Sequence, residues 1–277
     1  MSTNSLSGKI RKPYWFTRRP KDDFMNWVDK VELSSAYIWV SVDGDDTLNT
    51  GSFVLPYKTI SKALTVATVA RPNIMVMPGT YAEVDIVWPN YTGIRLASAF
   101  GGVKITQSTK AATAVVTMSP TRTSSWSASI SNIEIESDYT AGKCINIANA
   151  NVTAGNKMNI YLDNVALSTK AATDFSLVAT GTVAGAIRVY ATGNYPTWEG
   201  IITWTSFNTG DRLRVYNHRI IGTPTAAAAV ISEVSFVNCA VPAVTPHSDC
   251  LFTNVNCWHE SDADPDVYTA YTDQYSV

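Results

Sequence analysis

The feature that most constrains this chain is a series of short β-rich runs between residues 36 and 258. The runs are rich in Val, Ile and Thr, and they are separated by Gly, Asn, Pro and Thr. Similar phrases that contain Asn return at intervals of about 20 to 30 residues, which is the length of one coil of a β-solenoid. These phrases are residues 131–135, 163–167, 236–239 and 253–257. The pattern predicts an all-β protein whose coils stack about 4.8 Å apart.

The Asn residues in these phrases have a physical role at a recurring turn. Asn tolerates left-handed backbone geometry, and its side chain can bond the Asn of the neighbouring coil. The alternative all-β plan is a sandwich, which usually joins its strands by Asn-Gly or Asp-Gly hairpin turns. The chain contains no Asn-Gly, and its one Asp-Gly is Asp43-Gly44. The turn composition therefore favours the solenoid over the sandwich.

Composition and charge exclude several classes of protein. Charged residues make up 16% of the chain, against roughly 25% in typical soluble domains. The formal net charge of −2 argues against a nucleic-acid binder, and no apolar run is long enough to span a membrane. The first residues lack the order of a secretory signal, so we expect synthesis in a host cytoplasm.

The two ends differ from the solenoid segment and define three parts: an arm (1–35), the solenoid (36–258) and a tail (259–277). Prolines interrupt the arm, and a short amphipathic helix is expected over residues 22–31. The tail is acidic and rich in Tyr, so both ends could be solvated or could dock. The residues predicted to attach the arm to a larger assembly are Arg11, Lys12, Tyr14, Trp15, Phe16, Arg18 and Arg19.

One segment resembles a known family more specifically. An Asp-rich loop at 42–51 is followed by Pro-Tyr-Lys-Thr-Ile-Ser-Lys-Ala-Leu at 56–64 and by Pro-Gly-Thr-Tyr-Ala-Glu at 78–83. This succession is similar to the entry of the pectate-lyase-like right-handed parallel β-helix superfamily. The resemblance implies a right-handed parallel β-helix with a short N-terminal helix, begun by Thr59, that caps the open end of the solenoid.

Acidic side chains are the first candidates for chemistry. Glu134 and Glu136 alternate on one strand face, so they are the best catalytic pair, although a solvated strand face is the favoured interpretation. Three acids of the entry loop are weak candidates for Ca²⁺ ligands: Asp43, Asp45 and Asp46. The alternative is that they are simply residues of the loop that precedes the cap helix. A further cluster is interpreted as a surface ion-pair group: Asp211, Arg212, Arg214 and His218.

Cysteines and aromatic residues have structural interpretations as well. The four cysteines, with nearby His residues, match no common zinc module, so we expect buried free thiols. Tyr195, Trp198 and Trp204 surround Gly200 and are expected to form a subunit contact or, second, a glycan contact. The chain contains no nucleotide, zinc-protease or serine-hydrolase motif, so no cofactor is expected.

The resemblance indicates the fold well and the function poorly, because the superfamily includes polysaccharide lyases and hydrolases, adhesins and virion proteins of phages. With the arm and the low charge, it favours a non-enzymatic structural protein of a bacteriophage virion. We expect a capsid-decorating or fibre/tailspike-like component, in a homotrimer that binds other virion proteins of the capsid or tail. The alternatives are a polysaccharide-degrading tailspike enzyme and an adhesin that binds a host glycan.

Overall fold

The computed structural model describes residues 37–107, 114–149, 152–170, 174–182, 185–222, 224–228, 232–242, 250–260 and 268–270. The chain divides into two compact units, Met1–Ser35 and Ala36–Val277. The arm, with its expected helix at 22–31, lies outside the described residues. The fold described below is that of the second unit.

Most of the described residues form three parallel sheets. Sheet 1 has nine strands: β1 (Tyr37–Val40), β2 (Asn73–Val76), β5 (Ile94–Ser98), β8 (Trp126–Ser131), β11 (Lys157–Asp163), β14 (Ala186–Thr192), β17 (Arg212–Tyr216), β20 (Ser232–Val237) and β21 (Cys250–Val255). Sheet 2 has six: β3 (Gly79–Glu83), β6 (Val103–Gln107), β9 (Ile133–Ser137), β12 (Ala166–Thr169), β15 (Thr197–Glu199) and β18 (Arg219–Ile221). Sheet 3 has six: β4 (Ile86–Val87), β7 (Val116–Met118), β10 (Lys143–Ala148), β13 (Phe175–Thr180), β16 (Ile201–Ser206) and β19 (Thr225–Ala228).

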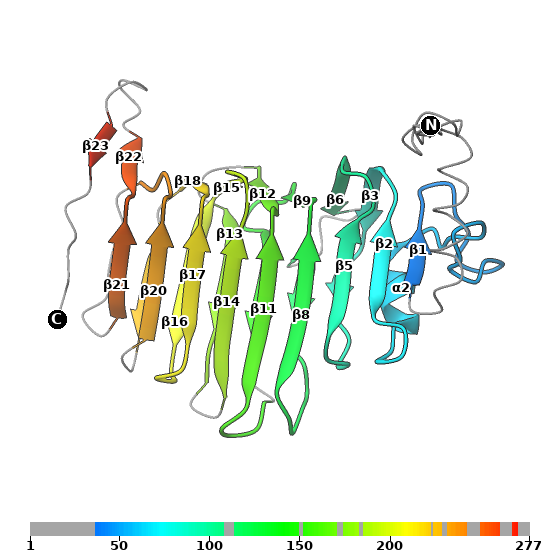
Figure 1. Cartoon of the computed structure of the whole chain (residues 1–277), viewed down its shortest axis with the longest axis horizontal. Coiled ribbons are helices and arrows are strands. Elements are labelled where there is room, and N and C mark those ends of the chain that lie inside the picture. The colour runs from blue at the N-terminus through cyan, green and yellow to red at the C-terminus, as the bar shows by residue number, and fades with distance from the viewer. Residues whose placement is uncertain are drawn as a thin grey trace, which may run out of the picture. The chain divides into compact units, whose positions relative to one another are not determined.

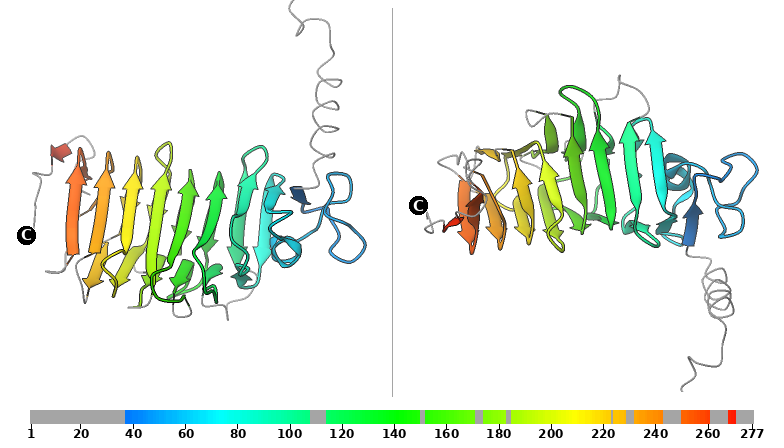
Figure 2. Two further views of the ribbon diagram at one scale, coloured as in Figure 1. Left: turned by 60° about the horizontal axis from the view of Figure 1, so that its bottom comes forward. Right: turned by 90° about the horizontal axis from the view of Figure 1, so that it is seen from above.

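One coil consists of one strand from each sheet, in the order sheet 1, sheet 2, sheet 3, as in β8, β9 and β10. Each strand pairs in parallel with the equivalent strand of the next coil, so that Ile160 of β11 lies between Ala128 of β8 and Val189 of β14. Figure 1 shows the strands of sheet 1 side by side in chain order, and Figure 2 shows the stacked coils from two other sides. The protein is a right-handed parallel β-helix, as the sequence predicted, and not a sandwich.

The core fills the interior of the coils. Inward and outward positions alternate along the strands, and β8 and β9 alternate between buried and partly exposed residues along their whole length. Because the strands pair in register, inward side chains form rows along the solenoid, such as Leu96, Ile130 and Leu162 of sheet 1. Each row buries apolar surface against its neighbours, and this burial is the main stabilising term.

The predicted Asn turn is confirmed at the corner between sheets 1 and 2. Five residues there adopt φ values between +51° and +56°: Asn132, Asn164, Asn217, Asn238 and Asn256. Asn164 Nδ2 donates to Asn132 Oδ1 at 3.0 Å, and Asn238 Nδ2 donates to Asn217 Oδ1 at 3.3 Å. We call these five residues the asparagine ladder. Tyr195, with a φ of +56°, takes the equivalent position between Asn164 and Asn217 and divides the ladder.

The predicted capping helix is α2 (Ile60–Val66), and its N-cap is Thr59, as expected. Thr59 Oγ1 accepts a hydrogen bond from Lys62 N at 3.1 Å, which satisfies one of the free amides of the first turn. Buried Glu83 accepts a second amide, from Ile60 N at 2.6 Å, and the Ser61 hydroxyl at 2.6 Å. Burial raises the pKa of Glu83, against the opposing effect of these hydrogen bonds. The last residue of the Pro-Gly-Thr-Tyr-Ala-Glu segment, Glu83, therefore has a structural role, because it holds the start of the cap helix.

The C-terminal end departs from the solenoid pattern. Trp258–Glu260 (β22) pairs with Tyr268–Ala270 (β23), and this pair is antiparallel. The expected tail at 259–277 thus contains paired strand in its described residues. Within the described part of the chain, no helix is long and apolar enough to cross a membrane.

Candidate functional site

A groove of about 580 Å³ lies at the corner between sheets 1 and 2. Four successive coils line it: residues 101–104, residues 132–134, Asn164 with Ala166, and Pro196. We call it the corner groove. The left-handed turn of the asparagine ladder places Asn132 and Asn164 in its wall, directly before the strands of sheet 2. The alternation of β6 and β9 turns Lys104 and Glu134 outward beside them.

The expected catalytic pair lies at the edge of this groove and shares one cation. Lys104 of β6 pairs in register with Glu134 of β9, and its Nζ atom lies 3.0 Å from Glu134 Oε1. The same Nζ atom also forms an ion pair with Glu136 Oε2. Hydrogen bonds to Glu136 and Glu134 raise the pKa of Lys104. The two acids thus form a half-exposed ion cluster, in agreement with the favoured interpretation of a solvated strand face.

The acids of the entry loop have structural partners. Asp45 Oδ1 accepts from Thr47 N at 2.6 Å and Leu48 N at 2.9 Å, and these backbone hydrogen bonds lower the pKa of Asp45. Asp46 accepts from the backbone and hydroxyl of Thr59, the last at 2.7 Å, so it holds the N-cap of α2. Asp43 does not converge with them, since no group of three metal-ligating side chains occurs among the described residues. The carboxylates of Asp45 and Asp46 therefore order the loop and the start of α2.

The prediction that the aromatic residues form a contact surface is wrong for both tryptophans, Trp198 and Trp204. Trp198 of β15 and Trp204 of β16 are 0% and 2% exposed, because strand alternation turns both into the core. Trp198 Nε1 donates to Val165 O at 2.8 Å within the interior. Tyr195 is 49% exposed and remains available at the surface, next to Pro196 of the corner groove. The sequence spacing grouped the three residues, but the turn at Gly200 (φ +93°) connects two different sheets.

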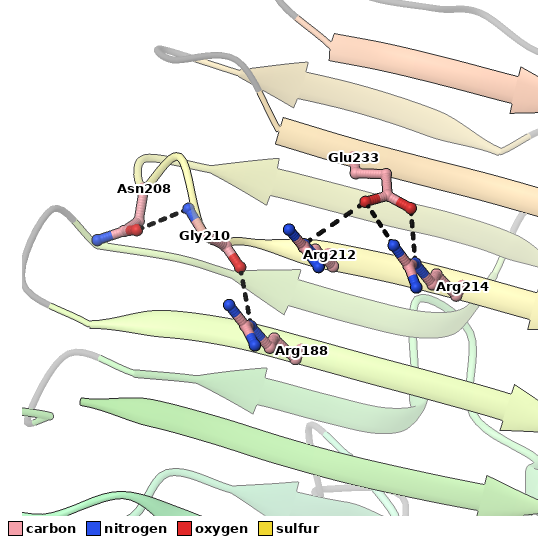
Figure 3. A network of polar contacts seen from close by, with 6 residues as sticks. All are labelled: Arg188, Asn208, Gly210, Arg212, Arg214 and Glu233. Atoms are coloured by element: carbon pink, nitrogen blue, oxygen red, sulfur yellow. Dashed lines mark hydrogen bonds and ion pairs between the residues drawn. The ribbon is translucent and has the colours of Figure 1, made fainter. Parts of the chain in front are cut away.

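The cluster from Asp211 to His218 is also divided by strand alternation. Figure 3 shows the outward part, in which Arg212 and Arg214 of β17 both contact Glu233 of β20, with Arg214 Nε 2.6 Å from Glu233 Oε1. The hydrogen bond to Glu233 raises the pKa of Arg214. Asp211 and His218 are buried, so the surface ion-pair interpretation holds for the arginines and is wrong for these two residues.

His218 leads to a pH-dependent prediction. Its imidazole packs against Trp198 with ring centroids 4.9 Å apart, and Nδ1 donates to Tyr216 O at 2.7 Å. Burial lowers the pKa of His218 to about 4, below its unfolded value of roughly 6.5. The unfolded chain therefore binds the proton first, and stability that is present above the unfolded pKa is lost as the pH falls towards the folded pKa.

We expect the contribution of neutral His218 to the free energy of unfolding, about 3 kcal/mol, to disappear as the pH falls from above the unfolded pKa to the folded pKa. Urea unfolding of the natural protein and of His218→Gln at several pH values measures this contribution. It is the difference between the two proteins in how steeply the free energy of unfolding changes with pH. Equal slopes for the two proteins would contradict the buried neutral imidazole.

The thiols follow the expectation where they are described. Cys144, Cys239 and Cys257 are buried thiols, and burial raises the pKa of Cys144 to about 12. Cys239 and Cys257 lie at equivalent positions on successive coils, and their mutual contact raises the pKa of Cys239. They are core residues, and the described part of the chain contains no group of three or more His, Cys, Asp and Glu side chains placed to hold a metal ion.

Several site residues were not anticipated from the sequence, and others cannot be placed. Lys104, Glu233 and the groove wall at Asn132 were missed because parallel pairing brings them together across about 20 to 30 residues of chain. The signal that could have found them is the in-register spacing of outward charges on adjacent coils. The predicted attachment residues lie outside the described residues: Arg11, Lys12, Tyr14, Trp15, Phe16, Arg18 and Arg19.

Comparison with known proteins adds two likenesses. A family described as "Protein of unknown function (DUF1565)" matches residues 42–87. The match covers the entry of the solenoid. The chain is also similar to the solved structure of pectin methylesterase PemA from Erwinia chrysanthemi, at 12% identity and a TM-score of 0.46, over 80% of this chain and 89% of the other. None of the curated proteins matches the chain. An identity this low carries no activity from one chain to the other.

Proposed function

We propose that this chain is a non-enzymatic structural protein of a bacteriophage particle, a capsid-decorating or fibre/tailspike-like component that is fixed by its N-terminal arm. The observation that carries the proposal is the use of the described acids as structural groups. Glu83, Asp46 and Asp211 accept backbone amides, whereas Glu134 and Glu233 pair with cations of adjacent coils. Groups in these roles stabilise a solenoid and are not poised for acid–base chemistry.

The mechanical properties of the solenoid also support a scaffold role. Every coil from β2 onward is joined to its neighbours by the parallel backbone ladder of sheet 1, and side-chain amides connect Asn132 with Asn164 at one corner. A backbone paired in this way leaves few unsatisfied groups and resists local opening. The proposal places the protein in the virion, as a homotrimer that contacts other capsid or tail proteins.

The test of this proposal is incorporation into particles. We expect that the full chain with Trp15→Ala, Arg18→Glu and Arg19→Glu is made in normal amounts but is absent from purified virions, because hot-spot aromatic and Arg residues of the arm are lost. The matched control is Lys157→Glu on β11, an exposed charge reversal in the solenoid, which should leave incorporation unchanged. Incorporation of the arm variant at the natural level would refute the attachment role.

A second candidate function is degradation of a host polysaccharide, and the proximity of Glu134 to the corner groove is the observation that favours it. The test compares the natural protein with Glu134→Gln and Glu136→Gln on host capsular or lipopolysaccharide glycans. We expect no depolymerisation by any of the three proteins. Cleavage by the natural protein that both variants lose would overturn the non-enzymatic proposal.

A further inference from the structure

The outward side of sheet 1 carries a patch of basic and aromatic side chains. Parallel pairing of β11, β14, β17 and β20 aligns six outward side chains in two neighbouring rows: Tyr161, Tyr190 and Arg214 in one, and Arg188, Arg212 and Glu233 in the other. The two tyrosine rings stack with their centroids 5.5 Å apart. Figure 3 shows the three arginines and the glutamate on the same side of the sheet. We call these six residues the cationic face.

The cationic face has an excess of positive charge. Its three guanidinium groups stand against one carboxylate, and the exposed charges at the two ends of β11, Lys157 and Asp163, cancel each other. The exposed rings add apolar surface beside the charges, since Tyr161 is 46% exposed. Arginine and tyrosine are the residues that most often dominate the binding energy of protein interfaces. The composition of the face therefore fits a protein segment that brings carboxylates.

The single carboxylate of the face leaves arginine donors for a partner. Glu233 binds Arg214 through two hydrogen bonds, at 2.6 and 3.0 Å, and its Oε2 atom lies 3.5 Å from Arg212 Nε. Arg188 has no carboxylate partner within the described residues, and its Nε atom donates to a backbone carbonyl at 3.3 Å. A guanidinium group has five N–H donors, so Arg188 and Arg212 can each bind a further carboxylate.

The C-terminal end of the solenoid supplies groups of the opposite charge. β22 and β23 form an antiparallel pair in a structure whose three large sheets are parallel. The stretch from the last residue of β22 to the end of the connection, Glu260 to Asp266, contains four acids and no Lys or Arg. We call β22, β23 and the connection between them the acidic hairpin.

The direction of β22 takes the acidic hairpin away from the cationic face of its own chain. β22 follows the corner turn at Asn256, as each strand of sheet 2 follows its own corner turn, so it leads away from sheet 1. Figure 1 shows β22 and β23 beyond the end of β21. The connection begins after the three residues of β22, about 10 Å along the chain from the corner. Its carboxylates are therefore better placed to meet another molecule than sheet 1 of the same molecule.

We propose that the acidic hairpin of one copy binds the cationic face of a neighbouring copy, with its aspartates on Arg188 and Arg212 and the stacked tyrosines beside them. The inference rests on the homotrimer of the proposed function and names the two surfaces that join its copies. Each copy carries both surfaces, so the contact is heterologous and three such contacts close a ring. Arginine–carboxylate pairs of this kind are directional and fix the orientation of the partner.

The experiment measures the mass of the full-length protein by sedimentation equilibrium. At about 100 μM protein and about 0.05 M NaCl, we expect an oligomer that dissociates at about 0.5 M NaCl, because salt screens exposed ion pairs. Arg188→Glu with Arg212→Glu should raise the protein concentration needed for half-association at least about tenfold. Lys58→Glu with Lys143→Glu is the matched control, since it changes the net charge equally on exposed or partly exposed residues outside sheet 1 and should leave association unchanged.

A charge-exchange experiment identifies the partner surface. Asp262→Lys, Asp264→Lys and Asp266→Lys in one protein should also prevent association, although each variant should keep the circular dichroism spectrum of the natural protein. Mixing this variant with the arginine variant should restore association, because the reversed face of one then meets the reversed hairpin of the other, while the two natural surfaces also meet.

Three results would overturn the proposed contact. They are natural association by either reversed variant alone, a mixture of the two variants that stays monomeric, and a natural protein that is monomeric at low salt. The last result also removes the homotrimer from the proposed function. Incorporation of the arm variant into virions is measured separately, so the attachment role stands or falls on its own result.

Discussion

Trp198→Ala is expected to lower the free energy of unfolding by about 3–5 kcal/mol. The indole is fully buried on β15, between Leu167 and Ile220 of the adjacent coils, and its Nε1 group donates to Val165 O at 2.8 Å. Alanine leaves a cavity that the stacked coils cannot close, because both neighbouring rungs are held by the backbone ladder. Equilibrium unfolding in urea, with an unchanged m-value, measures the loss.

Two further substitutions separate burial from a surface role. Trp198→Phe should lose clearly less stability than the alanine variant, since most of the ring volume is kept. Tyr195→Ala, at a side chain that is 49% exposed, should change stability by less than about 1 kcal/mol. If Trp198→Ala and Tyr195→Ala were equally stable, the inward orientation of the indole would be wrong.

Asp211→Ala is expected to destabilise the protein by a similar amount, about 3–5 kcal/mol. Asp211 is 1% exposed, and its carboxylate accepts from Ile187 N at 2.6 Å, from Ser206 Oγ at 2.8 Å and from Asn208 N at 3.2 Å. These donors belong to β14, to β16 and to the loop that leads to β17, so a single carboxylate connects two coils. Burial raises the pKa of Asp211 against the effect of these hydrogen bonds. Alanine leaves buried donors without an acceptor, which costs more than the bonds contribute.

The matched control for Asp211 is an exposed aspartate. Asp138 forms an ion pair with Lys170 at 3.7 Å, and both side chains face solvent. Asp138→Ala should therefore change the free energy of unfolding, measured in urea, by less than about 1 kcal/mol. A loss for Asp211→Ala no larger than that for Asp138→Ala would show that the carboxylate does not join the coils.

Much of the fold could be predicted because its signals are local. The left-handed turns at Asn132 and Asn164 need a residue that tolerates positive φ, and that requirement is written into each coil separately. The cap helix was predictable for the same reason, since Thr59 and the apolar spacing of Ile60, Ala63 and Leu64 are contained in one short segment.

The candidate site was predicted less well, because its residues come from different coils. Glu134 was recognised as an outward acid, but its partner Lys104 depends on which coil lies beside β9. Trp198 and Tyr195 looked alike at the sequence level, although Trp198 takes the inward position of β15 and Tyr195 lies in the left-handed turn before that strand.

The sequence by itself determined the type of coil, the corner turn and the capped beginning of the solenoid. These features follow from backbone preferences and from period-2 patterning, which act within a few residues. The tertiary structure alone decided that Lys104 lies between Glu134 and Glu136, that Asp211 connects β14 with β17, and that the asparagine ladder ends in an open groove. The physical reason is register: side chains far apart in the chain meet only after the parallel strands have fixed which rung lies on which.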